Sequence, residues 1–345
     1  MTSIAISKCV DRVKTAKNKA RSKEFVALVG AGFSCNAHPQ FPLWNEISQW
    51  VSDVFRDEPG LKPPKNVLGI EADDFTLAAE WYFYALGEKK IPLGKSAFIK
   101  AVDIRLTKYT NNRKLDLAAH AALVEKFDVI YTTNWDCLLE KSLKKSKIPY
   151  TRHLFDPTAC KGHGKWESQI STPGRLARKD LIKYHGCCTD SGGTSIVASR
   201  TDYDMRMRRV VNVIGASSIA GDFDQRLGDA IPILIGYSYK DINVRFVLSQ
   251  VNRSKSWRQK IRTLNVVVDN PAHFCDERLK FFRDVYGIET LFLFDKDSDY
   301  HKLRARWEAA HQLKDHGGSS GQCDKYKEAM TETSRQAFKE FFEAL

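Results

Sequence analysis

The sequence predicts an α/β protein with a Rossmann-like, doubly wound and mainly parallel sheet. Short apolar segments rich in β-branched residues recur along the chain, as expected for strands buried on both faces. Most of them run directly into a turn of glycine or polar residues, and a helical pattern follows. The segments that we interpret as strands are residues 25–29, 127–132, 181–186, 231–235, 264–268 and 290–294.

The composition indicates a protein with a substantial core and no membrane-spanning segment. The chain has 345 residues, enough for one large or two modest domains, and 43% of them are hydrophobic. No apolar run approaches the roughly 20 residues that span a bilayer, and residues 1–24 lack the continuous apolar core of a signal peptide. The eight cysteines form no CxxC pair, so we expect reduced thiols and a cytoplasmic location.

The chain is basic, with a net charge of +12. Part of the excess lies in residues 1–24, where Ile4, Ile6, Val10 and Val13 stand among Lys and Arg in an amphipathic helical pattern. We expect this N-terminal helix to pack on the domain, with binding to a partner or an anionic surface as the alternative. The other basic residues are spread along the chain and are expected to form solvated faces. A docking surface for an acidic partner or nucleic acid stays open.

The first predicted strand opens a nucleotide-binding βαβ pattern. Residues 25–29 run into the glycine turn Gly30–Ser34, and a helical pattern covers about 43–55. An inserted helical subdomain is expected at about 57–125. Its aromatic run, Trp81–Tyr84, is expected to pack in a core, with base stacking as the alternative.

The remaining segments complete one domain and a C-terminal extension. Residues 151–180 are polar and contain glycine, which predicts a long loop with short elements, and residues 202–227 have a helical pattern. The main domain is predicted at 25–310, after the N-terminal helix. A flexible linker at 311–323 and a helix at 324–345 for packing or assembly follow it.

Four predicted strands end in residues that suit ligand binding: Gly30–Ser34, Thr133–Asp136, His185–Gly186 and Gly236–Asp241. Taken singly, each has a structural alternative. The glycines can form a tight turn, Asn134, Asp136 and Asp241 can cap helices, and His185 can be a satisfied structural histidine. Taken together, they lie where the carboxyl ends of parallel strands meet, which is where open α/β sheets bind ligands.

The glycine turn indicates contact with phosphate but not hydrolysis of a nucleoside triphosphate. Glycines let the backbone approach a pyrophosphate, and the amides that follow can donate to its oxygens. Cys35 stands where a GxGxxG motif would have its third glycine, and no GK[ST] follows. ATP or GTP hydrolysis by this chain is therefore not expected.

These elements together resemble the motifs of the sirtuin-like superfamily, in particular its prokaryotic NAD-hydrolysing defence branch. Gly30–Ser34 is similar to the GAGxS phosphate loop, and Thr133–Asp136 is similar to the TN[YW]D element. Lys183–Gly186 is similar to [KL]xHG, and Gly236–Asn243 is similar to GxSxxDxN. The resemblance spans roughly residues 25–294.

The resemblance implies a role for each matched residue. Asn134 and Asp136 would line the nicotinamide-ribose pocket with Thr133 beside them, and His185 would be the catalytic histidine. The residues implied to bind the rest of the dinucleotide are Gly30, Ala31, Gly32 and Ser34 at the pyrophosphate, Gly236, Ser238 and Asp241 on the adenosine side, and Asp269 at the adenine or its ribose.

The chain departs from deacylating sirtuins in two ways. It lacks the two CxxC pairs of their zinc ribbon, and the adjacent Cys187 and Cys188 would chelate poorly with Cys160 and His163. No metal is therefore expected. The segment Pro39–Trp44 also lacks the acid and the arginine of the family's GIPDFR-like segment, which puts peptide deacylation in doubt but not NAD cleavage.

The resemblance thus implies an NAD glycohydrolase that releases nicotinamide and ADP-ribose, as the NAD-depleting effector of an anti-phage, abortive-infection system. No sensor domain is evident, so gating by homo-oligomerisation or by a partner is expected. A HerA-type hexameric ATPase is the preferred partner and an Argonaute-like protein the alternative, with nucleic acid bound through the partner. The competing functions are a non-hydrolytic module that senses NAD or ADP-ribose and an NAD-dependent protein deacylase.

Overall fold

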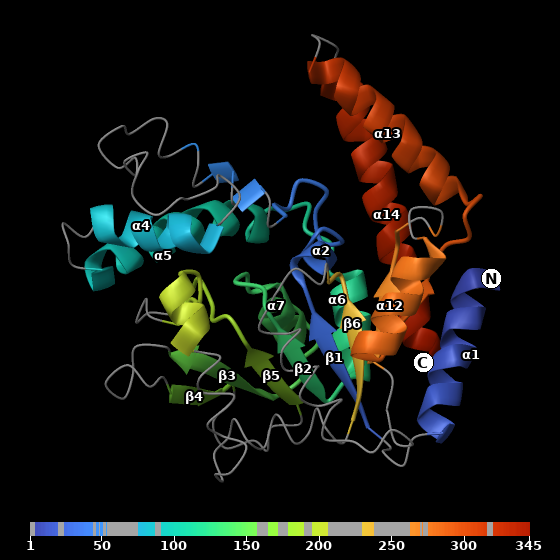
Figure 1. Cartoon of the computed structure of the whole chain (residues 1–345), viewed down its shortest axis with the longest axis horizontal. Coiled ribbons are helices and arrows are strands. Elements are labelled where there is room, and N and C mark those ends of the chain that lie inside the picture. Colours follow the sequence, from blue (N-terminus) through green and yellow to red (C-terminus); the bar gives the residue numbers. More distant parts are fainter. Residues whose placement is uncertain are drawn as a thin grey trace.

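The computed structural model describes residues 4–19, 24–43, 46–47, 49–50, 53, 75–86, 91–156, 165–171, 179–189, 195–205, 230–237, 263–269, 271, 275–315 and 320–345. Its centre is an eight-stranded sheet in the order β4-β3-β5-β2-β1-β6-β7-β8 (Figure 1). The strands are β1 (Phe25–Val29), β2 (Val129–Thr132), β3 (Tyr150–Asp156), β4 (Lys165–Ile170), β5 (Lys179–Lys183), β6 (Ile231–Ile235), β7 (Thr263–Val267) and β8 (Ile288–Phe292). Every neighbouring pair is parallel except β3 and β4, which confirms the predicted fold class.

The winding of the sheet reverses beside β1. The chain builds β2 and β5 on one side of this strand and β6, β7 and β8 on the other. In the register of the sheet, Val29 pairs with Thr132 and with Ile235, and Thr132 pairs with Lys183. The carboxyl ends of four strands therefore lie level, and the turns that follow them start side by side.

The central strands are buried on both faces, which explains their nearly continuous apolar sequences. Every residue of β2, β6 and β7 is buried, as is every residue of β1 after Phe25. Strands covered by helices on both faces need no alternation of polar and apolar side chains. The sequence pattern at these positions therefore predicts the position of each central strand well.

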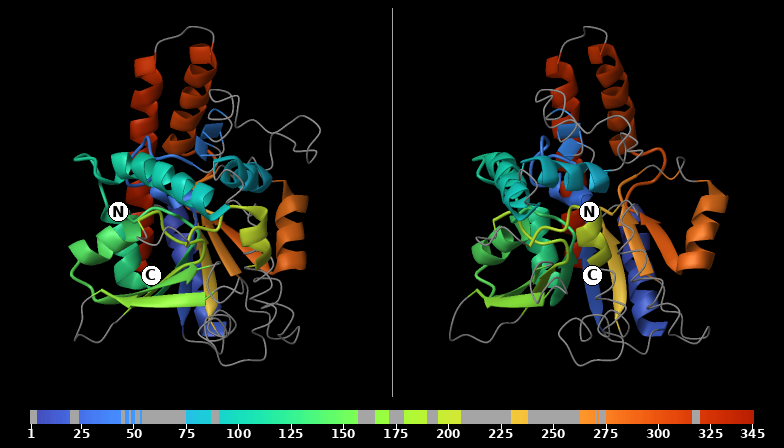
Figure 2. Two further views of the ribbon diagram at one scale, coloured as in Figure 1. Left: turned by 90° about the vertical axis from the view of Figure 1, so that its left-hand side faces the viewer. Right: turned by 60° about the vertical axis from the view of Figure 1, so that its left-hand side comes forward.

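Helices cover the sheet and extend beyond it (Figures 1 and 2). They are α1 (Ile4–Lys19), α2 (Ala31–Ser34), α4 (Phe75–Leu86), α5 (Ile91–Thr110), α6 (Ala118–Lys126), α7 (Leu138–Lys145), α12 (Asp276–Tyr286), α13 (Asp299–Asp315) and α14 (Ser320–Ala344). The main core joins one face of the sheet to α1, α6 and α14 through residues such as Val13, Leu123, Ile233 and Phe341. The expectation that the N-terminal helix packs on the domain is thus confirmed.

A separate cluster of buried side chains holds α4 and α5 to the main sheet. Phe75, Phe83 and Phe98 pack there with Trp135, which belongs to the turn after β2. Tyr82 and Phe83, from the predicted aromatic run, are buried in this cluster, so this part of the run packs in a core as expected. The turn after β2 is consequently fixed from the side of the helices as well as from the sheet.

The structure differs from the sequence prediction at the edges of the sheet. The expected long loop at 151–180 contains β3 and β4, which pair antiparallel. An edge strand needs only one covered face, so polar residues such as the exposed Ser168 and Gln169 are tolerated there and hide the strand signal. The last strand begins two residues earlier than predicted and includes Glu289, whose charge is paired with Arg12 on α1.

The C-terminal extension also differs from the prediction. The helices α12 and α13 were not predicted, and the expected linker at 311–323 is helical at both of its ends. The reason is that α13 and α14 pack side by side and extend away from the sheet as a pair (Figures 1 and 2), so tertiary contacts stabilise helix where the sequence pattern is weak. Most of the predicted helix at 202–227 lies outside the described residues.

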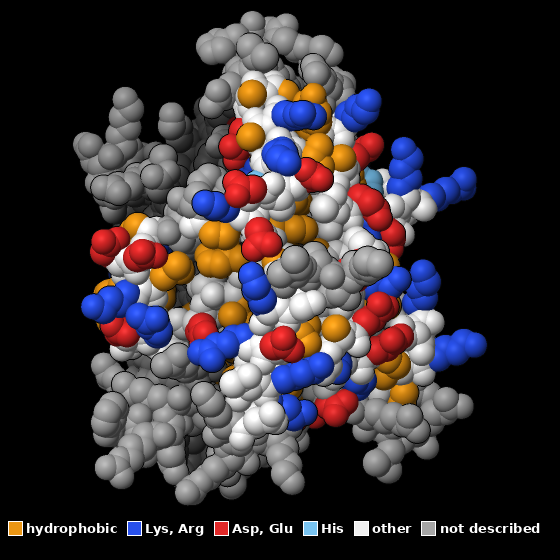
Figure 3. All heavy atoms as spheres, turned by 90° about the vertical axis from the view of Figure 1, so that its right-hand side faces the viewer, with side chains coloured by type: hydrophobic (Ala, Val, Ile, Leu, Met, Phe, Trp, Pro, Cys, Tyr) orange, Lys and Arg blue, Asp and Glu red, His pale blue; other side chains and the backbone are white. Residues whose placement is uncertain are grey.

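The charged side chains visible on one face of the molecule are mixed in sign. On the side shown in Figure 3, Lys and Arg are interspersed with Asp and Glu and with apolar side chains. This mixture favours solvated surface over a continuous basic patch on that face. None of the helices in the described part of the chain is long and apolar enough to cross a membrane.

Replacing Phe341 with alanine is expected to lower the free energy of unfolding by about 3–5 kcal/mol, since the ring is fully buried in the main core. The matched control is Phe281→Ala, because Phe281 is 51% exposed, and its expected cost is below about 1 kcal/mol. Denaturant unfolding of both variants measures the difference. Equal losses would mean that α14 is not part of the core.

Candidate functional site

Two glycine turns interlock at the centre of the sheet, after β1 and after β6. The amide of Gly30 donates to the carbonyl of Ile235 at 2.9 Å, and the amide of Gly32 donates to the carbonyl of Gly236 at 3.1 Å. Gly236 has a φ of 63°, and a Cβ placed on it would lie 2.2 Å from the nitrogen of Phe33. A Cβ on Gly30 would lie 2.5 Å from the oxygen of Gly236. Both positions therefore require glycine, because one backbone passes directly against the other.

This interlocking changes the expected role of the glycine turn. In addition to the two bonds above, the amide of Phe33 donates to the carbonyl of Gly30 at 3.0 Å. The amides of Gly30, Gly32 and Phe33 are thus engaged inside the protein, whereas the sequence pattern predicted that such amides would face a pyrophosphate. Gly32 is nevertheless exposed and Ala31 is half-buried, so the turn presents backbone to solvent.

The side chain of Phe33 fixes the glycine turn to the core. Its ring is fully buried and meets His120 on α6, with 4.5 Å between ring centroids, and Phe338 on α14, with 5.2 Å. Just after the turn, Asn36 accepts a hydrogen bond from Ser334 of α14 at 2.7 Å. The C-terminal helix thus supports the turn from behind, as part of the packing role predicted for it.

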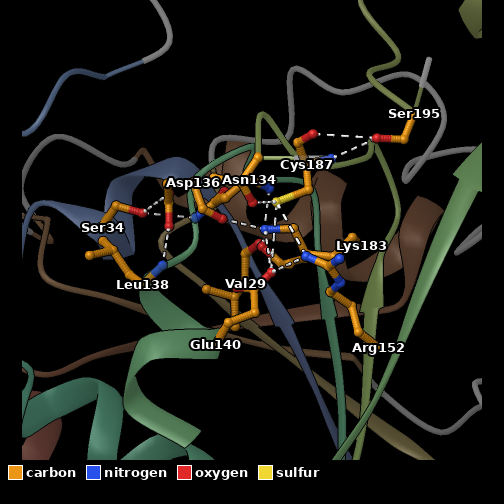
Figure 4. Close-up of polar contacts among 12 residues, drawn as sticks. Val29, Ser34, Asn134, Asp136, Leu138, Glu140, Arg152, Lys183, Cys187 and Ser195 are labelled. Carbon is orange, nitrogen blue, oxygen red and sulfur yellow. Dashed lines mark hydrogen bonds and ion pairs between the residues drawn. The ribbon is translucent and has the colours of Figure 1, made fainter. Parts of the chain in front are cut away.

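Asn134 is held beside the glycine turn by several hydrogen bonds. Thr132 Oγ1 donates to the carbonyl of Val29 at 2.9 Å and accepts from the amide of Asn134 at 3.1 Å. Asn134 Nδ2 donates to the carbonyl of Gly30 at 3.1 Å and to Ser34 Oγ at 2.9 Å (Figure 4).

These bonds settle the orientation of the Asn134 amide. A carbonyl oxygen can only accept, so the atom that faces Gly30 must be the nitrogen. The other atom, Oδ1, is then left as a buried acceptor that has no hydrogen-bond partner within the described part of the chain. A buried acceptor of this kind carries a free-energy penalty unless a donor reaches it, which is what a bound hydroxyl or water would supply.

Asp136 completes this hydrogen-bonded group. Ser34 Oγ donates to Asp136 Oδ2 at 2.8 Å, and the amide of Leu138 donates to Asp136 Oδ1 at 2.9 Å. Burial raises the pKa of the Asp136 carboxyl above its ordinary value, although Lys183 and the two hydrogen bonds favour the charged form. Asp136 therefore accepts a hydrogen bond at the start of α7, as the capping interpretation predicted, and also lies in the hydrogen-bonded group with Ser34 and Asn134.

His185 lies two residues beyond β5, which ends at Lys183 and not at the predicted residue 186. The amide of Tyr184 donates to the carbonyl of Thr132 at 2.7 Å, which continues the pairing of β5 with β2 up to the histidine. The next residue, Gly186, has a φ of 82°, and a Cβ on it would lie 1.9 Å from the oxygen of Ser195. The His185 ring is buried and meets the ring of Tyr203 edge-on, with 5.1 Å between centroids.

The other predicted site residues are less closely gathered. Thr133 is half-buried, and its amide donates to the carbonyl of Val29 at 3.2 Å. Asp269 forms an ion pair with Arg304 on α13, which gives this carboxylate a structural partner at the end of β7. Ser238 and Asp241 lie outside the described residues.

A buried polar cluster that the sequence did not predict lies behind the turn after β2 (Figure 4). It consists of Glu140, Arg152, Lys183 and Cys187. A hydrogen bond from Cys188 and the charge of Lys183 lower the pKa of Cys187 to about 7, against the opposing effect of burial. The available signal was Lys183, a charged residue that directly follows the apolar pair Leu181 and Ile182 of β5.

No metal site is apparent among the residues that the structure describes, where no three or more His, Cys, Asp or Glu side chains gather suitably. Cys187 and Cys188 are buried with free thiols. Cys160 and His163, the other two residues considered as ligands, are not among the described residues.

Comparison with known protein families gives one result, and it falls on this site. Residues 128–291 match the family model of the SIR2-like domain. The match begins just before β2 and includes Asn134, Asp136, His185 and Gly236. A search of curated proteins finds no match.

Replacing Asp136 with asparagine is expected to give a pH-dependent gain in stability. A carboxyl whose pKa is raised by folding stabilises the fold fully below its ordinary pKa of 3.8, and this contribution is lost as the pH rises through the raised value. The free energy of unfolding of the wild type should therefore fall relative to Asp136→Asn as the pH rises. Denaturant unfolding at several pH values measures this difference.

The control for this measurement is Asp299→Asn. Asp299 is exposed, and its hydrogen bond with Lys302 lowers its pKa, so any pH dependence should be small and of the opposite sign. A difference between wild type and Asp136→Asn that stays constant with pH would show that burial does not govern this carboxyl.

Proposed function

We propose that this chain, whose residues 128–291 match the SIR2-like domain of NAD-dependent enzymes, is an NAD glycohydrolase. It would cleave the bond between nicotinamide and ribose and release nicotinamide and ADP-ribose. The observation that carries the proposal is the group formed by Ser34, Asn134 and Asp136 at the switch point of the sheet, with the buried acceptor Asn134 Oδ1 beside it.

Cleavage of the nicotinamide–ribose bond requires little covalent catalysis by the protein. Nicotinamide leaves readily because its departure neutralises the pyridinium charge, and the transition state resembles an oxocarbenium ion. The protein must hold the dinucleotide, stabilise the developing positive charge and place a water molecule. These tasks call for a buried anion, a fixed acceptor and a base.

The site contains a candidate for each task. Asn134 Oδ1 can accept a hydrogen bond from water or from a ribose hydroxyl, because its amide nitrogen is already held by Gly30 and Ser34. Asp136, when ionised, would stabilise positive charge at the ribose. His185 would act as the general base towards a ribose hydroxyl or water, since an imidazole titrates near neutral pH.

Access to the site is expected to be controlled. Ser34, Asn134, Asp136 and His185 are each at most 7% exposed, so only a small part of each side chain meets solvent. An ungated NAD hydrolase would also deplete the NAD of its own cell. We propose further that the chain is the NAD-depleting effector of an anti-phage defence system, activated by homo-oligomerisation or by a partner such as a HerA-type ATPase.

The alternatives rest on weaker support. A non-hydrolytic sensor of NAD would need neither His185 nor a buried anion next to the ribose. A protein deacylase would be expected to keep the zinc-ribbon cysteines and the acid and arginine that Pro39–Trp44 lacks.

The variants Asn134→Ala and His185→Ala are expected to lower the rate of nicotinamide release from NAD by about 10²–10⁴-fold, since each removes a group that acts on the reacting ribose. The assay uses the purified chain, alone and with its co-expressed candidate partner. His311→Gln is the matched control, because His311 is exposed on α13 away from the sheet.

Three results would contradict the proposal. Unchanged turnover in either alanine variant would remove the assigned roles. Tight binding of NAD without cleavage, with or without a partner, would favour the sensor. Nicotinamide release that depends on an acetylated peptide would favour the deacylase.

A further inference from the structure

Lys183 is a fully buried cation at the site end of β5. Its side chain is 1% exposed, its Nζ donates to the backbone carbonyl of Asp136, and Nζ lies 3.4 Å from Glu140 Oε1 on α7 (Figure 4). Taking an ammonium group out of water costs free energy, and an apolar side chain could fill the same space. The position of this costly group, directly behind the turn that carries Asn134 and Asp136, points to a role in placing that turn.

Two consecutive carbonyls of the turn are held from the same neighbouring segment. Lys183 Nζ holds the carbonyl of Asp136, and the amide of Cys188 holds the carbonyl of Trp135 at 3.0 Å. His185 lies between these two donors in the chain. The turn that contains Asp136 is thus connected to the segment that contains His185 by two hydrogen bonds, and both are accepted by backbone carbonyls of that turn.

Glu140 keeps the Lys183 ammonium group in place. It is 4% exposed, and its Oε1 also lies 3.9 Å from Arg152 and 3.8 Å from the sulfur of Cys187. The groups that face Lys183 are therefore the carboxylates of Glu140 and Asp136 and the thiols of Cys187 and Cys188. Burial alone would lower the pKa of Lys183, but the negative charge of these groups raises it above its ordinary value and so favours the charged form.

We propose that Lys183, held by Glu140, is a positioning residue for NAD cleavage, which fixes the Asn134–Asp136 turn by holding the backbone carbonyl of Asp136. This inference rests on the proposed function. Lys183 touches no reacting atom; it acts on the ribose only through the turn that it holds. A displacement of about 1 Å at a catalytic group can cost about 10²-fold in rate, so a loosened turn has a measurable effect.

The same strand provides a matched control at its other end. Lys179, the first residue of β5, is also buried, and its Nζ donates to the carbonyls of Glu125 and Phe127 at 3.0 and 2.9 Å. The two lysines make the same kind of contact, but Lys179 is about 13 Å from Lys183 along the strand, away from the site. Its loss should affect the fold and not the turn after β2.

The test compares Lys183→Met/Glu140→Met with Lys179→Met. The double variant removes the charges of Lys183 and Glu140 together, and such replacements by apolar residues are often neutral for stability. Arg152, the third charge of the cluster, is 18% exposed and keeps its hydrogen bond to Gln169. It is expected to keep an unfolding temperature near that of the wild type while kcat for nicotinamide release falls by about 10–100-fold. Lys179→Met should keep kcat within about 3-fold, whatever its stability.

The pH profile adds a readout that a purely structural role would not move. Lys183 favours the charged form of Asp136 more strongly than Glu140 opposes it, so the double variant should lose activity at a higher pH on the acid side than the wild type. Unchanged kcat and an unmoved acid limb in the double variant would overturn the inference. An equal loss of kcat in Lys179→Met would do the same.

Hydrogen exchange separates this inference from the proposed function. The amide of Leu138, which binds Asp136, should exchange faster in the double variant than in Lys179→Met. If the wild type does not cleave NAD but exchange at Leu138 rises as expected, the proposed function is wrong and only the structural part of the inference stands, namely that Lys183 fixes the Asn134–Asp136 turn. If the wild type cleaves NAD and exchange is unchanged, the positioning role is wrong.

Discussion

The site depends on the parallel register of β1 with β2 and β6. Val29, Thr132 and Ile235 are paired level with one another, and each is the last residue of its strand. The backbone leaves the sheet three times at one place, and only glycine lets two of these turns touch, as Gly30 and Gly236 show. Asn134 enters the same space and binds the carbonyl of Gly30. A shift of one residue in this register would separate these groups. The pairing of the strands therefore determines where the residues of the candidate site lie.

Much of the central architecture follows from the sequence because burial on both faces imposes a simple pattern. The apolar runs at β1, β2, β6 and β7 predict buried parallel strands, and the turns after β1, β2 and β6 carry residues of the candidate site. The edges could not be predicted in the same way. β3 and β4 expose one face, and α13 gains its stability from packing on α14, so neither needs a strong local pattern. The local sequence pattern thus predicts strands and helices least well where long-range contacts determine the structure.

The candidate site was only partly predictable from the sequence. The reason is again that it depends on contacts between residues far apart in the chain. The turns holding Asn134 and His185 were found because their residues are polar at the ends of apolar strands. The sequence does not show that the carbonyl of Gly236 accepts a hydrogen bond from the amide of Gly32. It also does not show that Phe33 packs against Phe338, about 300 residues later in the chain. The cluster of Lys183 and Glu140 joins a strand to a helix. Its members look unrelated in the sequence, and only their shared burial reveals them.

Asp136 shows why a structural role and the proposed role at the ribose need not be alternatives. One oxygen of its carboxylate caps the start of α7, and the other accepts from Ser34, which in turn accepts from Asn134. The cap fixes the carboxylate, and the carboxylate then orients a chain of donors that ends at the Asn134 amide. Any substitution that removes the side chain disturbs both the helix and this chain. Asparagine retains a polar group for the cap while removing the charge, so it separates the two roles where alanine would combine them.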